Sequence, residues 1–141
     1  MELASGGVNI NSKEARIHTK SMYEQIRNRR TDCINVSVNS GFTLEQVTII
    51  KNYLFKDCHE LSYGYMPFEP SYDIAESWRR LSEKSGKNIK HHDIILLYHE
   101  LLEIQILLQG RCTQKEAHEL ASKQYNYHLL SDIYYRSIGR L

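Results

Sequence analysis

The sequence predicts an all-α protein: a single-domain bundle of five to six helices around one central apolar helix, with at most one short strand or ribbon. The chain has 141 residues, which suits one domain with a sizeable core. Residues 93–110, DIILLYHELLEIQILLQG, are rich in leucine and contain no Pro or Gly before their end. This composition predicts a helix over about 92–109. Because its apolar residues occupy more than one face, we expect other helices to surround it.

The composition indicates a folded domain but does not define a partner. Apolar residues make up 41 % of the chain, ten residues are Tyr, and the formal net charge is +1. A charge so close to zero requires neither nucleic acid nor membrane as a partner. The three cysteines are odd in number and widely spaced, so they predict no disulfide framework or zinc motif and favour a reducing compartment. No signal peptide and no membrane segment is recognisable.

The first half of the chain reads as a loose start followed by helices. Residues 1–11 look like a linker or disordered start, and 12–141 form the predicted helical domain. Ser12 opens a helix over 12–30. Residues 33–38, CINVSV, are β-branched and alternating, so they predict a short strand or an extended connector. The capping box that begins at Thr43 predicts a helix to about residue 58, with His59 near its end. Its apolar stripe consists of Leu44, Val47, Ile50, Leu54 and Phe55.

The second half reads as a loop and four helices. Gly and Pro mark residues 61–70 as a loop, and Ser71 can cap a helix over 72–84. The central helix follows, and Gly110 ends it. A second capping box at Thr113 predicts a helix to about 124, and the last helix covers about 128–138. The first of these helices has Ile74, Trp78 and Leu81 on its inner face. Small or apolar residues suit close packing on the central helix: Ala117, Leu120 and Ala121. The last helix carries Leu129, Ile133, Tyr134 and Ile138.

The central helix carries ionisable side chains that are costly to bury. His99 and Glu103 are four residues apart and share one helix face, while Asp93 and Glu100 form a second line beside them. Because a short turn at Gly110 makes the next helix antiparallel, we expect His118 to approach Glu103. One interpretation is a structural polar pair between helices. The other is a site in which imidazoles and carboxylates bind a metal or transfer protons.

Two metalloenzyme motifs are partly present. Residues 99–103, HELLE, differ by one residue from the HExxH of zinc peptidases, because Glu103 replaces the second His. The candidate metal ligands are therefore His99 and Glu103, with His118 or His92 as the third. Alternatively, the order of four side chains matches HD-type phosphohydrolases: His59, His92, Asp93 and Asp132.

A basic segment near the N-terminus is the candidate for binding phosphate. Residues 13–30 contain six Lys or Arg residues and two Glu residues. The residues that we expect to contact nucleic acid are Lys20, Arg27, Arg29 and Arg30. A docking face for an acidic protein, or a simple solvated face, would have the same composition.

A longer pattern over residues 40–127 resembles a known class. Its parts are Gly41-Phe42-Thr43, Phe55 with His59, Phe68 to Asp73, Ala75 to Trp78 with Leu81, Asp93, His99-Glu100 with Glu103, Gly110, Ala117-His118 and Tyr125 to Tyr127. This order resembles the C-terminal toxin modules of bacterial polymorphic toxins, found in Rhs/YD-repeat, LXG and phage head-morphogenesis proteins. One position departs from the class, because Glu69 follows Phe68 where the class has Asp.

The resemblance implies an antibacterial effector, delivered as part of a larger secreted protein into the cytoplasm of a competitor and neutralised by a cognate immunity protein. It implies a nuclease that cleaves DNA or RNA. His99 would be the general base or a ligand, and Glu103 and His118 would complete the centre. Asp93 and Glu100 would be supporting carboxylates, with His59 a further candidate. A divalent metal, magnesium or zinc, and metal-free acid–base chemistry both stay open. The alternatives are a non-enzymatic interaction module of phage or immunity type, an HD-like phosphohydrolase and a zinc peptidase.

Overall fold

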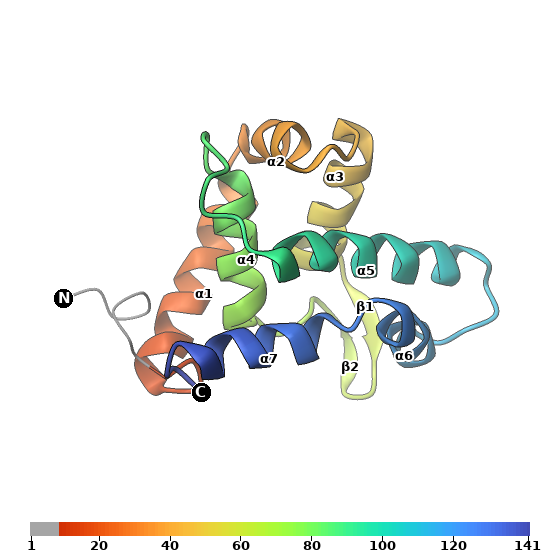
Figure 1. The fold of residues 1–141 in the computed structure, drawn as a ribbon. Coiled ribbons are helices and arrows are strands. Elements are labelled where there is room, and N and C mark those ends of the chain that lie inside the picture. The colour runs from red at the N-terminus through yellow and green to blue at the C-terminus, as the bar shows by residue number, and fades with distance from the viewer. Residues whose placement is uncertain (1–8) are drawn as a thin grey trace.

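The protein is a helical bundle with one small ribbon (Figure 1). We describe residues 9–141 of a computed structural model, which contain seven α-helices, one π-helical turn (η1) and two strands. The elements are α1 (Lys13–Asn28), α2 (Asp32–Ser40), α3 (Leu44–Lys51), η1 (Asn52–Lys56), β1 (His59–Leu61), β2 (Gly64–Met66), α4 (Tyr72–Ser82), α5 (His91–Leu108), α6 (Gln114–Gln124) and α7 (Tyr127–Ser137). The all-α prediction is confirmed.

Helix α5 is the central element, as expected from its leucine-rich sequence. It crosses the middle of the molecule, with α3 above it, α4 beside its N-terminal end, and α6 and α7 below it (Figure 1). At its start, the Asp93 carboxylate accepts a hydrogen bond of 2.8 Å from the backbone N–H of Lys90. At its end, Gly110 adopts φ +73°, a left-handed conformation that glycine tolerates best. The next helix therefore folds back against α5, and α5 and α6 are in contact.

The predicted strand or connector at 33–38 is wrong, because these residues form helix α2. Tertiary contacts outweigh the β preference of the β-branched residues. Val36 is fully buried, and the Asn39 side-chain amide donates to the carbonyls of Leu81 (2.9 Å) and Glu83 (2.6 Å) at the end of α4. Gly41, at φ +83°, ends the helix. This added helix accounts for the seventh helix of a bundle expected to have five to six.

The helix predicted to reach residue 58 ends earlier and changes its pitch. After Lys51 the backbone continues as η1, and Asp57 leaves the helix in an extended conformation. The loop predicted over 61–70 contains most of an antiparallel ribbon, in which His59 pairs with Met66 and Leu61 with Gly64. His59 is thus a strand residue rather than a helix C-terminal residue. Its Nε2 lies 2.8 Å from the Tyr53 carbonyl, which fixes the ribbon against η1.

The main core lies between α1, α3, α4 and α5, where Trp78 and Phe55 make an edge-to-face contact. The expected inner faces are only partly correct. Leu44 and Leu120 are exposed, and so are three apolar residues of the last predicted helix: Leu129, Ile133 and Ile138. Helix α7 instead buries Tyr127, Ser131 and Tyr135.

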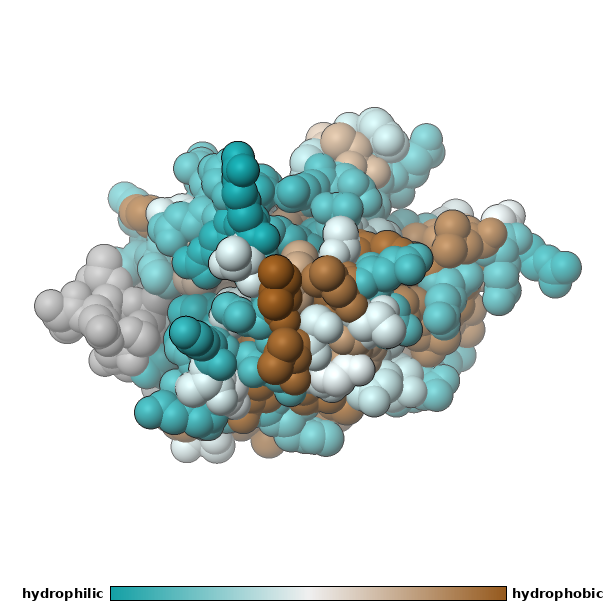
Figure 2. Space-filling model, turned by 90° about the horizontal axis from the view of Figure 1, so that it is seen from above, coloured by the Kyte–Doolittle hydropathy of each residue, from teal (hydrophilic) through white to brown (hydrophobic). Residues whose placement is uncertain are grey.

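The outer surface is a mixture of residue types. Seen from above, hydrophilic residues predominate, and hydrophobic residues gather near the middle of the view (Figure 2). Among residues 9–141, no helix has both the length and the apolar character needed to cross a membrane. The two ends of the described chain are joined, since the Ile10 N–H donates to the Arg140 carbonyl at 3.0 Å.

Candidate metal centre

Three side chains converge where α5 and α6 pack together. His99 Nε2 lies 3.1 Å from Glu103 Oε1 and 3.2 Å from His118 Nδ1, and His118 Nδ1 lies 2.9 Å from Glu103 Oε1. The expected approach of His118 to Glu103 is therefore observed. It follows from two local features, the i, i+4 spacing on α5 and the Gly110 turn that returns the chain to α5.

A second layer of hydrogen bonds orients these atoms. His99 Nδ1 donates to the Tyr125 carbonyl at 2.9 Å, so Nε2 faces the cluster. Nε2 carries a lone pair when the ring is neutral and donates to Glu103 when the ring is protonated. The other Glu103 oxygen, Oε2, accepts from the Tyr53 hydroxyl and, at 3.3 Å, from Gln114 Nε2. Metal-binding imidazoles and carboxylates are typically held by partners of this kind.

The three converging atoms fit a divalent cation. In a tetrahedral zinc site with bonds of about 2.0–2.1 Å, the ligand atoms lie about 3.3 Å apart, close to the three separations in this cluster. Two imidazoles and one carboxylate also form a ligand set that catalytic zinc sites use. Among residues 9–141, this is the one group of three or more His, Cys, Asp or Glu side chains close enough to share an ion.

The pKa values of the group follow from its burial and hydrogen bonds. Burial raises the pKa of the Glu103 carboxyl, but hydrogen bonds from His118, His99 and Tyr53 outweigh burial and lower it to about 2. The hydrogen bond to Glu103 raises the pKa of His118. Glu103 is therefore an anion across the physiological range, as a metal ligand or an imidazolium partner needs to be.

Glu100, which follows His99 on α5, differs from the three converging residues in its hydrogen bonding. It is 5 % exposed, and its carboxylate makes no hydrogen bond within the part of the chain described. Its burial, and then the charge of Glu103, raise the pKa of its carboxyl well above the ordinary value. Glu100 lies in the wall of the same cavity as the three converging side chains. A buried carboxyl without a partner is costly, which favours a functional role for it.

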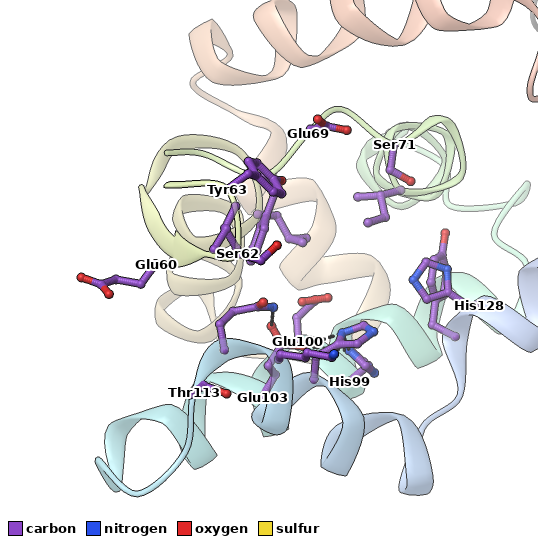
Figure 3. Close-up of a pocket in the computed structure, with 18 of the residues that line it drawn as sticks. Glu60, Ser62, Tyr63, Glu69, Ser71, His99, Glu100, Glu103, Thr113 and His128 are labelled. Carbon is purple, nitrogen blue, oxygen red and sulfur yellow. Dashed lines mark hydrogen bonds and ion pairs between the residues drawn. The ribbon is translucent and has the colours of Figure 1, made fainter. Parts of the chain in front are cut away.

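The cluster lies against a cavity of about 630 Å³ (Figure 3). His99 and Glu103 are 2 % and 1 % exposed, so they form its floor, whereas the His118 side chain is 37 % exposed. Opposite them are the ribbon and the segment that leads into α4. Apolar and aromatic side chains cover much of its wall: Tyr23, Leu54, Leu61, Phe68, Ile74 and Tyr127.

Two residues of the predicted site lie elsewhere. Asp93 makes a bidentate ion pair with Arg80, with both N–O distances at 2.8 Å, and His92 Nε2 lies 3.2 Å from the same guanidinium. Asp93 is therefore a partner of α4, and its expected role as a supporting carboxylate is wrong. His92 is likewise not a ligand of the cluster, because it lies two turns before His99 on α5, beside Arg80 and Tyr134.

The described residues do not form the metal site expected of an HD-type phosphohydrolase. His59 is held against η1 and stacks on Phe68 at 3.9 Å between ring centroids. Asp132 is exposed on α7, while His92 and Asp93 bind Arg80. These four residues form no shared cation site, since the group around Glu103 is the one that the described chain contains.

The basic segment does not contribute to the cavity. Lys20, Arg29 and Arg30 are exposed on or after α1, and Arg27 donates from Nε to the Phe55 carbonyl at 2.6 Å. None of the four is among the residues that line the cavity, to which α1 contributes Tyr23. Their binding to nucleic acid stays a prediction for a surface outside this centre.

Three residues near the centre were not expected from the sequence. Tyr53 reaches Glu103 from the π-helical turn, a feature that often occurs at functional sites but has no clear sequence signal. Gln114 reaches it because it follows the Thr113 cap, and this position could have been found from the capping box. His128 enters the cavity from α7, with its Nδ1 3.9 Å from Asp73 Oδ2. Its ring centroid is 5.8 Å from that of His118.

Comparison of the chain with protein-family models, with curated proteins and with solved structures finds no match in any of the three. The function of the domain is therefore inferred from the geometry of the centre.

Proposed function

We propose that this domain is a metal-dependent hydrolase whose centre is formed by His99, Glu103 and His118. The observation that carries the proposal is the convergence of three oriented ligand atoms, 2.9–3.2 Å apart, on the floor of a cavity. A bound divalent cation would supply a Lewis acid beside the cavity. Three protein ligands leave a position open, which is typical of catalytic rather than structural zinc sites.

Glu100 is the proposed general base. It follows His99 directly, as the catalytic Glu follows the first His in HExxH, and it lines the same cavity. A water molecule in the cavity would lose a proton to the Glu100 carboxylate as it attacks the substrate, and the proton would then pass to the leaving group. Tyr53 and Gln114 would hold Glu103 in place from the side away from His118.

The biological role is proposed from the sequence resemblance. In this proposal the domain is an effector that acts in the cytoplasm of a target bacterium, and a cognate immunity protein protects the producer. An apolar cavity beside a reactive centre gives such a partner a surface to cover. Nuclease activity is one form of this hydrolase proposal.

A metal-free reaction is the second candidate. The hydrogen bond to Glu103 raises the pKa of His118, while the hydrogen bond to the Tyr125 carbonyl sets the tautomer of His99. One imidazole could therefore donate a proton and the other accept one, as cleavage of RNA through its 2′-hydroxyl requires.

The deciding experiment measures metal binding. The purified domain is stripped with chelator and titrated with Zn²⁺, Mn²⁺ and Mg²⁺ in a calorimeter. We expect one ion per chain, weakened at least 100-fold in His118→Ala, because that change removes one of three ligands. The control is His91→Ala, which removes an exposed imidazole at the far end of α5. Equal affinity in the wild type and His118→Ala would refute the metal centre.

A growth assay tests the role of Glu100. Expression of the wild-type domain in the bacterial cytoplasm should stop growth, and Glu100→Gln should abolish this toxicity while it keeps the metal affinity and the melting temperature. Toxicity that persists in Glu100→Gln would rule out Glu100 as the base. Toxicity that persists in His118→Ala would contradict both the metal-dependent and the metal-free reaction, because each of them uses the His118 imidazole.

A further inference from the structure

We infer that the substrate of this centre is a polypeptide, bound in extended form along β1, and not a polynucleotide. The inference deepens the proposed function, on which it rests, by naming the substrate class. Three independent features of the cavity carry it: the charge of its walls, its shape along β1 and the free backbone edge of the ribbon.

The walls of the cavity lack the cations that a polynucleotide needs. The segment from residue 57 to residue 78, which forms the wall opposite the cluster, contains no Lys or Arg and five acidic residues. Two of these acids, Glu60 and Glu69, are exposed at the edge of the cavity (Figure 3). Lys115 is the one Lys or Arg among the lining residues. Phosphate backbones bind through several such cations, and exposed carboxylates repel them.

The charge of the rim suits a neutral or basic peptide instead. Carboxylates at the edge attract a chain that carries Lys or Arg, and the apolar wall formed by Leu54, Phe68 and Ile74 can take an aliphatic or aromatic side chain. Tyr63 and Tyr65, which are 55 % and 70 % exposed, add aromatic surface on the ribbon.

The cavity continues along β1 as a trough. A second hollow of about 490 Å³ is lined by β1 residues, by Cys58 and Cys112, and by the start of α6. The two hollows share Glu60, Leu61, Thr113 and Gln114, so they meet between β1 and the start of α6. A trough along a strand, with the metal centre beside it, has the form that an extended chain requires.

The ribbon offers backbone groups to such a chain. Strand β1 pairs with β2 on one edge, and no backbone group from residue 58 to residue 70 makes a backbone hydrogen bond outside the ribbon. An unpaired strand edge readily accepts another strand through its N–H and C=O groups. A peptide added to β1 would have its backbone fixed by the ribbon and one side chain directed into the apolar cavity.

The reaction on this substrate is hydrolysis of an amide bond. The oxygen of a water molecule bonds to the acyl carbon, and the C–N bond breaks. One proton of the water passes through the Glu100 carboxylate to the leaving nitrogen, and the second passes to the same nitrogen as the products separate, which gives a carboxylate and an ammonium group. No oxidant, reductant or other reactant is needed.

The test compares the two substrate classes side by side. The Zn²⁺-loaded wild type and Glu100→Gln are incubated with a defined mixture of synthetic 14-residue peptides, with supercoiled plasmid and with total RNA. Products are identified by mass spectrometry and on gels. Cleavage of peptides by the wild type alone, with both nucleic acids intact, would support the inference. Cleavage of plasmid or RNA with intact peptides, or of no substrate, would overturn it, while metal binding in the same sample would leave the proposed function standing.

Charge-reversal variants test which of two surfaces binds the substrate: the acidic edge of the cavity or the basic face of α1. Glu60→Lys combined with Glu69→Lys should lower kcat/KM for a Lys-containing peptide roughly tenfold, because two exposed attractions become repulsions. Reversal of Lys20, Arg29 and Arg30 to Glu should lower cleavage only if the substrate is a polynucleotide. A loss of activity in the second variant and none in the first would overturn the inference.

A binding readout does not depend on activity. Glu100→Gln loaded with Zn²⁺ is mixed with the best-cleaved peptide, and amide hydrogen exchange is followed residue by residue. Peptide binding should slow exchange at least tenfold at the β1 residues whose N–H groups point away from β2, because these groups gain partners, while the N–H groups already bonded to β2 should change little. Unchanged exchange at β1 with a saturating peptide would refute the extended mode of binding.

Discussion

The substitution Lys51→Met tests how helix α2 is held in place. Lys51 Nζ donates to Asp32 Oδ1 at 2.8 Å, and the two side chains are only 5 % and 2 % exposed. Lys51 also donates to the Arg29 carbonyl at 2.9 Å. The second Asp32 oxygen accepts from Trp78 Nε1 at 3.0 Å. The ion pair therefore joins the start of α2 to α3, and the indole joins it to α4.

The expected loss of stability in Lys51→Met follows from the Asp32 charge that remains in the folded protein. Met has a similar volume, so Lys51→Met removes the cation without a large cavity and leaves the Asp32 carboxylate buried and unpaired. Removal of one partner of a buried ion pair costs about 3–5 kcal/mol, a large part of the ~5–15 kcal/mol that stabilises a typical domain. For a domain of this size, the melting temperature should fall by roughly 10–20 °C.

The assay is urea unfolding followed by circular dichroism. Lys56→Met is the matched control, because Lys56 is exposed on η1 and its loss should change the free energy of unfolding by about 0.5 kcal/mol or less. Asp32→Asn added to Lys51→Met should recover part of the loss, since it neutralises the stranded charge. A loss of about 1 kcal/mol or less in Lys51→Met would refute the argument that a stranded carboxylate dominates.

Three further predictions concern the centre and the helix ends. Tyr53→Phe removes a hydrogen bond to the carboxylate ligand and should weaken Zn²⁺ binding about 10–100-fold in chelator competition; an unchanged affinity would contradict its positioning role. Burial lowers the pKa of His92, so the folded protein holds it neutral and loses stability as the pH falls below the unfolded value near 6.5. Between pH 7 and pH 5, His92→Gln should lose less stability than the wild type in urea titrations, by at most about 2 kcal/mol, and equal losses would contradict this. Gly86→Ala should destabilise more than Gly139→Ala, because both have positive φ but only at Gly86 would a Cβ lie 2.8 Å from the Asn39 side-chain oxygen; equal melting temperatures would show that the contact relaxes.

The metal centre shows how much of a site can be predicted from the spacing of side chains along the sequence. His99, Glu100 and Glu103 could be grouped from the sequence because an α-helix fixes their relative directions within one turn. His118 could be added because a glycine turn makes the following helix antiparallel. Asp93 and His92 shared the same helix but not the same site, because Arg80, from a different helix, binds both. Helical periodicity predicts on which face of a helix a side chain lies, but not which residue of another helix contacts it.

The sequence by itself determined the helical class, the central helix and the local caps, because leucine content, capping boxes and a terminal glycine act within a few residues. Only the tertiary structure decided that residues 33–38 are helical, that a π-helical turn brings Tyr53 to Glu103, and that His128 enters the cavity. It also decided that the basic face of α1 lies apart from the centre. These features depend on contacts between residues distant in the chain, whose burial and hydrogen bonds outweigh local preference.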